Sequence, residues 1–109
     1  MTPMLSRLSD KDFHLVANSA TPVVITFTAP RRCQDCRLQE PVLHDLAEAG
    51  FPIWIVDEEE PDSAAIVAKW GKRGVPFHHV FQNGRILAEE LDRVGPPKIK
   101  ALLASATAR

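Results

Sequence analysis

Short apolar runs along the chain predict its strands. The segments 23–27 and 51–57 are almost continuously apolar, as expected of strands buried on both faces of a sheet. The segments 77–81 and 85–91 flank Asn83-Gly84, a dipeptide that favours a two-residue hairpin turn. We therefore predict two buried strands followed by an antiparallel pair.

Apolar residues spaced three or four positions apart predict four helices, at 9–19, at 33–49, at 64–70 and from Pro96 onward. The inward stripe of the second helix is expected to contain Leu38, Val42, Leu43, Leu46 and Ala47. Ser9 and Asp12 have the spacing of a capping box, and Ser63 is a candidate N-cap of the third helix. We expect the last residues, 104–109, to fray.

These elements alternate in the order β-α-β-α-β-α-β-β-α when a short strand at 4–8 is included. Crossovers through helices require parallel pairing and place helices on both faces of the sheet, while the final hairpin adds an antiparallel edge. The sequence thus predicts an α/β fold. With 109 residues, 45% of them hydrophobic, and no repeat or linker, we expect one domain, residues 1–109, with one core.

Composition argues against several classes of partner. The net charge is −1 and the basic residues are scattered, so we expect no nucleic-acid partner. No apolar run approaches the roughly 20 residues of a spanning helix, and the first residues lack the apolar core of a secretory signal. We therefore expect a cytoplasmic protein without a membrane partner.

The chain has two cysteines, and both lie in the heptapeptide RRCQDCR, residues 31–37. In a reducing cytosol, such a pair is more often redox-active or metal-binding than structural. A zinc site would need two further ligands, and the candidates are His14, His44, His78 and His79. His78 and His79 are neighbours on a predicted strand and point to opposite faces, so they cannot both converge on one metal. This favours a redox pair that needs no metal and no cofactor.

The position of the pair at the start of a helix predicts which sulfur reacts first. Two cysteines on the first turn lie within disulfide reach of each other, and only the outer one, Cys33, can meet a partner protein. The positive end of the helix favours a thiolate at Cys33, and Arg32 and Arg37 add positive charge nearby. Asp35 opposes them with a negative charge. These three charged residues are therefore predicted to tune the thiolate.

Several motifs, in order, resemble the thioredoxin family over essentially the whole chain. They are VVITFTAP before the cysteines, CQDCRLQEPVLHDLA with Pro41 five residues after Cys36, KWGKRGVPF, VFQNGR, and RVG before the last helix. Cys-x-x-Cys alone is a weak signal, whereas the ordered set is specific. The resemblance implies a thioredoxin fold, with a central mixed sheet of four or five strands flanked by four helices.

The resemblance also implies roles and partners. Cys33 would be the attacking thiol and Cys36 the resolving thiol of a thiol:disulfide oxidoreductase, and Pro76 would follow a cis peptide bond. Substrate contacts would come from Arg32, Val75, Pro76 and Gly95. The implied partners are protein disulfides or dithiols, with a thioredoxin reductase as a candidate electron donor, and the chain would act as a monomer.

The chain departs from the family pattern at places that matter for turnover. Arg32 stands where thioredoxins have a tryptophan, and Gln34-Asp35 replaces glycine-proline. The buried aspartate of the family aligns with Thr26, and its lysine partner with Trp54. These changes leave a second hypothesis open: a thioredoxin-like binding module or assembly chaperone that uses the fold's substrate groove, formed by these contact residues, without turnover.

Overall fold

The structure, a computed structural model, describes residues 5–71 and 73–107. Its strands are β1 Ser6–Arg7, β2 Val23–Thr28, β3 Ile53–Asp57, β4 Phe77–Gln82 and β5 Arg85–Leu91. Its helices are α1 Phe13–Ala17, α2 Gln34–Glu48, α3 Ala64–Trp70 and α4 Pro96–Thr107, with a 3₁₀ turn at Pro61–Ser63. The predicted element order is confirmed. Met4, the first residue of the predicted strand 4–8, lies outside the described residues.

The five strands form one mixed sheet in the order β1-β3-β2-β4-β5. The central strand β2 pairs in parallel with β3 and antiparallel with β4, and all six of its residues are buried. The hairpin between β4 and β5 turns at Asn83 and Gly84, whose φ angles are 53° and 76°. Asparagine and glycine tolerate such positive φ angles best, which is why this dipeptide predicted the turn correctly.

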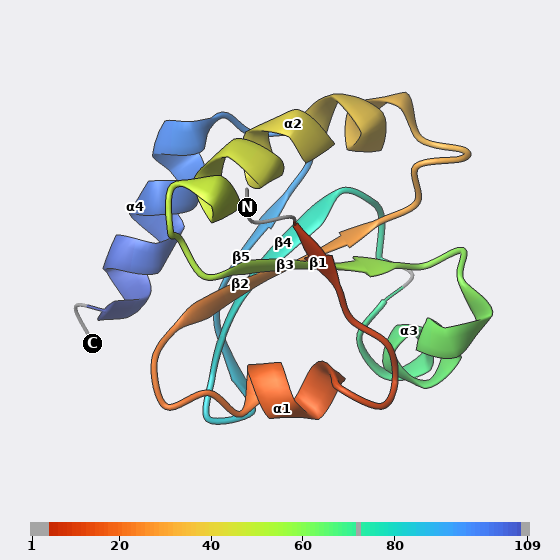
Figure 1. Cartoon of the computed structure of the whole chain (residues 1–109), viewed down its shortest axis with the longest axis horizontal. Helices are drawn as coiled ribbons and strands as arrows, with labels where there is room; N and C mark the ends of the chain where they lie inside the picture. Colours follow the sequence, from red (N-terminus) through yellow and green to blue (C-terminus); the bar gives the residue numbers. More distant parts are fainter. Residues whose placement is uncertain (1–4, 72, 108–109) are drawn as a thin grey trace.

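The helices cover the sheet in two layers (Figure 1). Helices α2 and α4 lie on one face, and α1 and α3 lie on the other. Because side chains alternate across a strand, Val24 of β2 packs with Leu43 of α2 and Ile99 of α4. Its neighbours Ile25 and Phe27 pack instead with Phe13 of α1 on the opposite face. Thr26 therefore points to the face that α2 covers.

The inward stripe of α2 differs from the predicted one. Leu38 is 46% exposed, whereas Gln39 is 1% exposed. The buried side chains of the helix are Cys36, Gln39, Leu43 and Leu46. Their spacing of three, four and three residues is helical, so the predicted period is correct. The buried stripe differs from the prediction because it includes the polar residue Gln39.

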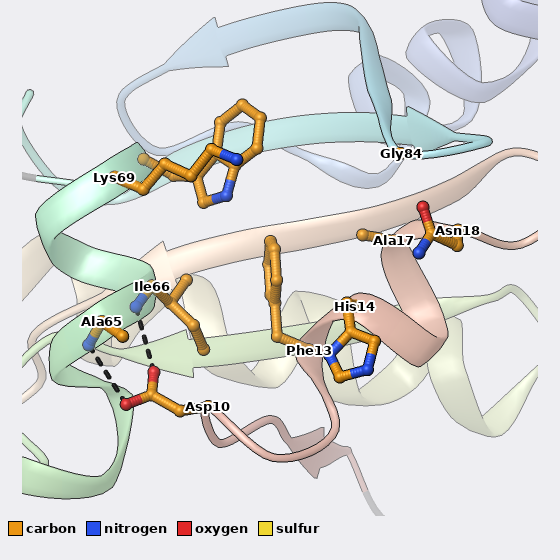
Figure 2. A pocket seen from close by; sticks show the side chains of 10 residues that line it. Asp10, Phe13, His14, Ala17, Asn18, Ala65, Ile66, Lys69 and Gly84 are labelled. Atoms are coloured by element: carbon orange, nitrogen blue, oxygen red, sulfur yellow. Dashed lines mark hydrogen bonds between the residues drawn. The ribbon is translucent and has the colours of Figure 1, made fainter.

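Of the two predicted helix caps, the first is partly formed, and α3 takes its capping side chain from another segment. The Ser9 amide donates to Asp12 Oδ1 at 2.6 Å, which is half of the expected capping box, although α1 itself begins at Phe13. Ser63 is the N-cap residue of α3, as predicted, but its side chain does not cap the helix, because its hydroxyl donates to carbonyls of the preceding turn. The α3 amides of Ala65 and Ile66 instead donate to the carboxylate of Asp10, from the segment before α1 (Figure 2).

The prediction that residues 104–109 fray is wrong as far as Thr107. Helix α4 continues to that residue, and Ala106 is buried in the cluster shared by α2 and α4. Residues 108–109 lie outside the described part of the chain. Within the described residues, no helix has the length and apolar character needed to cross a membrane.

Candidate active site

The cysteine pair lies at the start of α2, as predicted. Cys33 is the N-cap residue, with φ −129° and ψ 108°, and Cys36 lies within the first turn. The two are joined by a disulfide, with their Cα atoms 5.2 Å apart. The Cys36 amide donates to Cys33 Sγ at 3.1 Å. Cys33 is half-buried while Cys36 is 1% exposed, so the pair presents one sulfur to solvent and keeps the other inside.

The sulfur of Cys33 faces the loop before β4. The Val75-Pro76 peptide bond is cis, which confirms the prediction for Pro76. The carbonyl oxygen of Val75 lies 3.8 Å from Cys33 Sγ. Gly74 has φ 107°, a conformation that side chains rarely adopt, and a β-carbon there would also meet Leu91. The structure therefore brings together three predicted site residues: Cys33, Val75 and Pro76.

A third segment, residues 92–95, lies against the cis-proline loop. The Asp92 amide donates to the Pro76 carbonyl at 2.9 Å, which joins the segment to the cis-proline loop. Gly95 lies at its end, where its carbonyl accepts the first hydrogen bonds of α4. Gln39 holds the middle of the segment, because its side-chain amide bonds both backbone polar groups of Val94. The apolar pattern of α2 does not predict a buried Gln39, although its spacing from Cys36 and Leu43 is a signal for it.

The arginines before Cys33 are paired rather than free. Arg32 lies 3.7 Å from Glu58 and 3.9 Å from Glu59, and Arg31 lies 3.0 Å from Glu60. The acidic turn after β3 thus lies against the loop before α2, and the Arg31 amide also donates to Glu59. Since each of these arginines has a carboxylate close by, each adds less positive potential near Cys33 than an unpaired arginine would.

The two other residues predicted to tune the thiolate have different contacts. Asp35 Oδ1 lies 4.0 Å from Arg93 Nε, and both side chains are at least half exposed. This pair connects the first turn of α2 with the segment 92–95. Arg37 turns back across the loop before α2, where its guanidinium donates to the Pro30 carbonyl at 2.6 Å.

Beneath the cysteine helix, two buried polar residues pair across β2 and β4. Thr26 Oγ1 lies 2.8 Å from His78 Nδ1, and both residues are fully buried. His78 Nε2 lies 3.1 Å from the Asp92 carbonyl, which can only accept, so Nε2 carries the proton and Nδ1 accepts from the threonine. Burial lowers the pKa of His78 to about 4, so the imidazole is neutral near pH 7. Trp54, which aligns with the lysine partner of the family's buried aspartate, packs on the opposite face of the sheet from Thr26.

The neighbouring His79 has a different environment, on the face of α1 and α3. It stacks on Phe77 at 4.6 Å between ring centroids, and its Nε2 accepts from Arg73 at 3.0 Å. Arg73 also pairs with Glu89 at 3.1 Å. Burial is the main reason that the pKa of His79 falls to about 4. His78 and His79 point to opposite faces of the sheet, as predicted, and both are buried.

Among residues 5–71 and 73–107, neither cysteine belongs to a cluster of three or more potential metal ligands. Within the described residues, the potential ligands that meet within 4.8 Å of one another are those of His44, Asp45 and Glu48 on α2. Two of the three residues are exposed, and exposed acidic groups gather commonly without a metal.

The structure also has a cavity of about 320 Å³ between α1 and α3 (Figure 2). Phe13, Ile66 and Trp70 give it apolar walls, and His14 and Lys69 lie among its polar lining residues. It lies on the opposite face of the sheet from α2 and contains neither cysteine. We place the functional site at the cysteines because disulfide exchange with a polypeptide needs an accessible sulfur beside a backbone edge, which the cavity does not offer.

The sequence model of the family named Thioredoxin matches residues 5–107. The chain belongs to the thioredoxin family. It is 34% identical to the thioredoxin of Haemophilus influenzae over 86 residues, which cover 77% of this chain and 79% of that one. It is 33% identical to the thioredoxin of Pyropia yezoensis over 103 residues, covering 93% and 92% of the two chains.

Solved structures agree with the thioredoxin fold. The crystal structure of Malassezia sympodialis thioredoxin (Mala s 13) superposes with a TM-score of 0.80 at 23% identity, covering 98% of this chain and 95% of the other. Thioredoxin f from spinach chloroplast gives a TM-score of 0.74 at 19% identity, covering 94% and 93%. The predicted fold is therefore confirmed, and family membership together with the disulfide-bonded pair supports oxidoreductase activity.

Proposed function

We propose that this thioredoxin-family chain exchanges dithiol and disulfide with protein substrates, with Cys33 as the attacking thiol and Cys36 as the resolving thiol. The observation that carries the proposal is the asymmetry of the pair: Cys33 is accessible beside the Val75 carbonyl, and Cys36 is buried behind it. A polypeptide lying along Val75 would bring its disulfide next to Cys33, whereas the buried Cys36 would stay out of its reach.

In the reducing direction, the Cys33 thiolate attacks one sulfur of the substrate disulfide. That S–S bond breaks as the mixed disulfide forms, and the departing substrate thiolate takes a proton from solvent. The Cys36 thiolate then attacks Cys33 Sγ, which releases the second substrate thiolate and forms the Cys33–Cys36 disulfide. Two electrons have passed to the substrate, and an external dithiol must reduce the pair before the next cycle. A thioredoxin reductase is our candidate for that partner.

The surroundings of Cys33 would favour its thiolate form. Its sulfur accepts from the Cys36 amide at the helix N-terminus, and the thiolate would accept more strongly. Arg32 would contribute less than an unpaired arginine because Glu58 and Glu59 lie within 4 Å of it. The pKa of Cys33 in the reduced protein should therefore lie below the free-thiol value of about 8.5, mainly through the helix terminus.

Fewer groups would stabilise the Cys36 thiolate that the resolving step needs. The Ala29 amide lies 3.5 Å from Cys36 Sγ and would donate to its thiolate. The position of the family's buried carboxylate is occupied by Thr26, which donates to a neutral His78 and offers no anionic proton acceptor. This observation favours the second candidate, a binding module that engages partners at the same groove with slow or no turnover.

Reduction of insulin by dithiothreitol, with and without the protein, separates the two candidates. An oxidoreductase accelerates the reaction above the dithiothreitol background, and Cys33→Ser abolishes the acceleration. If the unmodified protein gives only the background rate, the oxidoreductase proposal is wrong and the binding module remains. A Cys36→Ser variant that accumulates a mixed disulfide would support the assigned order of the two sulfurs.

A further inference from the structure

Gln39 is a buried polar residue to which the disulfide chemistry assigns no part. It lies one turn after Cys36 on the inner side of α2 and is 1% exposed, although glutamine is mostly a surface residue. Its Nε2 donates to the Val94 carbonyl at 2.9 Å, and its Oε1 accepts from the Val94 amide at 2.7 Å. The side chain therefore satisfies both backbone polar groups of a single residue.

Val94 needs such a partner because it lies in neither a strand nor a helix. The segment 92–95 connects β5 to α4, and Val94 within it pairs in no strand ladder. Buried backbone groups in such a segment must find other partners, and for Val94 the partner is Gln39. One amide side chain on the cysteine helix thus fixes the position of this connection.

The same connection lies along the proposed substrate groove. Its first residue, Asp92, is joined to the cis-proline loop through the Pro76 carbonyl. Its second, Arg93, lies 4.0 Å from Asp35 on the turn that carries the cysteines. A groove whose backbone is already held in place loses less conformational freedom when a polypeptide binds.

We propose that Gln39 is a positioning residue for polypeptide substrates. By holding Val94 it fixes the segment 92–95 against the cis-proline loop and the turn that carries the cysteines. The proposal rests on the proposed function of Cys33 and Cys36 and adds to it a source of selectivity between polypeptide and small disulfides. A small disulfide reaches Cys33 without using the groove, so its reaction should not depend on Gln39.

The test measures the first attack by Cys33 in a Cys36→Ser background, with insulin and with glutathione disulfide. Gln39→Leu removes both hydrogen bonds at similar side-chain volume. We expect the rate constant with insulin to fall about tenfold, because the two hydrogen bonds that hold Val94 in place are lost. The rate constant with glutathione disulfide should stay within about twofold. Glu40→Gln, on the exposed neighbouring position, is the matched control and should change neither.

Gln39→Glu adds a readout that loss of packing would not give. A carboxylate can accept from the Val94 amide but has no proton for the Val94 carbonyl, whereas the protonated acid can supply both bonds. The insulin rate of Gln39→Glu, divided by that of the parent at each pH, should therefore rise toward one as the pH falls. The new carboxylate also shifts the titration of Cys33, but that shift affects attack on either disulfide. The rise with insulin must therefore exceed the rise measured with glutathione disulfide in the same variant. Gln39→Leu should show no such rise.

The outcomes separate this proposal from the function on which it rests. Equal losses with insulin and glutathione disulfide in Gln39→Leu, or no loss with either, would overturn the positioning role while leaving the exchange chemistry intact. A parent protein that attacks neither disulfide would overturn the proposed function, and the positioning role with it. If Gln39→Leu does not fold, as judged by thermal unfolding, the pH ratio of Gln39→Glu decides the question alone.

Discussion

The charge of Asp35 gives a sharp test of how the helix start controls Cys33. Asp35 is the second residue after the N-cap, where a carboxylate opposes formation of a nearby thiolate. Its exposed side chain lies 4.0 Å from Arg93, so Asp35→Asn removes a negative charge and also leaves Arg93 without this partner. Both effects should lower the pKa of the Cys33 thiol.

The size of the effect follows from the exposure of the site. A surface charge at a helix terminus is worth about 0.3–1 kcal/mol, which corresponds to a pKa change of about 0.2–0.7. For a two-electron couple, the same energy makes the reduction potential less negative by about 6–21 mV. We also expect the potential of the unmodified protein to be less negative than the roughly −270 mV of thioredoxin.

The thiol pKa can be measured from the pH dependence of alkylation of Cys33, and the potential from equilibration with glutathione buffers. Asp45→Asn is the matched control, because Asp45 is ten residues further along α2, about 15 Å by helical rise and beyond a Debye length. It should change neither quantity. An unchanged pKa in Asp35→Asn would refute the electrostatic reasoning, although the exchange role of Cys33 would stand.

Three further predictions concern the scaffold around the site. The free energy of unfolding should fall as the pH decreases from about 6.5 toward 4, because the unfolded chain binds a proton at His79 in that range and the folded protein does not. Urea unfolding at several pH values should show this pH dependence reduced in His79→Gln and retained in His14→Gln, the control at an exposed site. Leu38→Ser should lower the free energy of unfolding by under about 0.5 kcal/mol, since Leu38 is exposed, whereas Leu43→Ala in the core should lower it by about 2–5 kcal/mol. Similar losses in the two variants would contradict the observed orientation of α2. Asp10→Ala should cost about 0.5–2 kcal/mol by removing the cap of α3, and a neutral result would show that Asp10 does not act as a cap.

The features predicted correctly from the sequence are those that depend on neighbours along the chain. The buried strand β2, the Asn83-Gly84 turn and the start of α2 at Cys33 all follow from local patterns of residue type. The cis bond before Pro76 was predicted from family resemblance rather than from local physics.

The features that the sequence did not reveal depend on contacts between distant segments. Asp10 caps a helix more than fifty residues away, and no local signal distinguishes it from an ordinary surface carboxylate. Gln39 is buried because Val94, 55 residues later, provides its partners. Burial of His78 similarly depends on Thr26 and on the Asp92 carbonyl. In each case a polar residue takes a partner that periodicity alone cannot identify, because periodicity describes only one element at a time.

The dependence of Val94 on α2 also bears on how the protein is made. During synthesis Cys33 leaves the ribosome 61 residues before Val94, a delay of about 3–12 s at about 5–20 residues per second. Throughout that interval the nascent chain carries its cysteine pair without the segment held by Gln39, and for most of it the chain also lacks the loop of Val75. The central strand also lacks β4, its antiparallel neighbour, for most of this time. The nascent chain therefore exposes a dithiol before the segments that would select its substrates have folded. Early protection of the cysteines would have to come from another molecule.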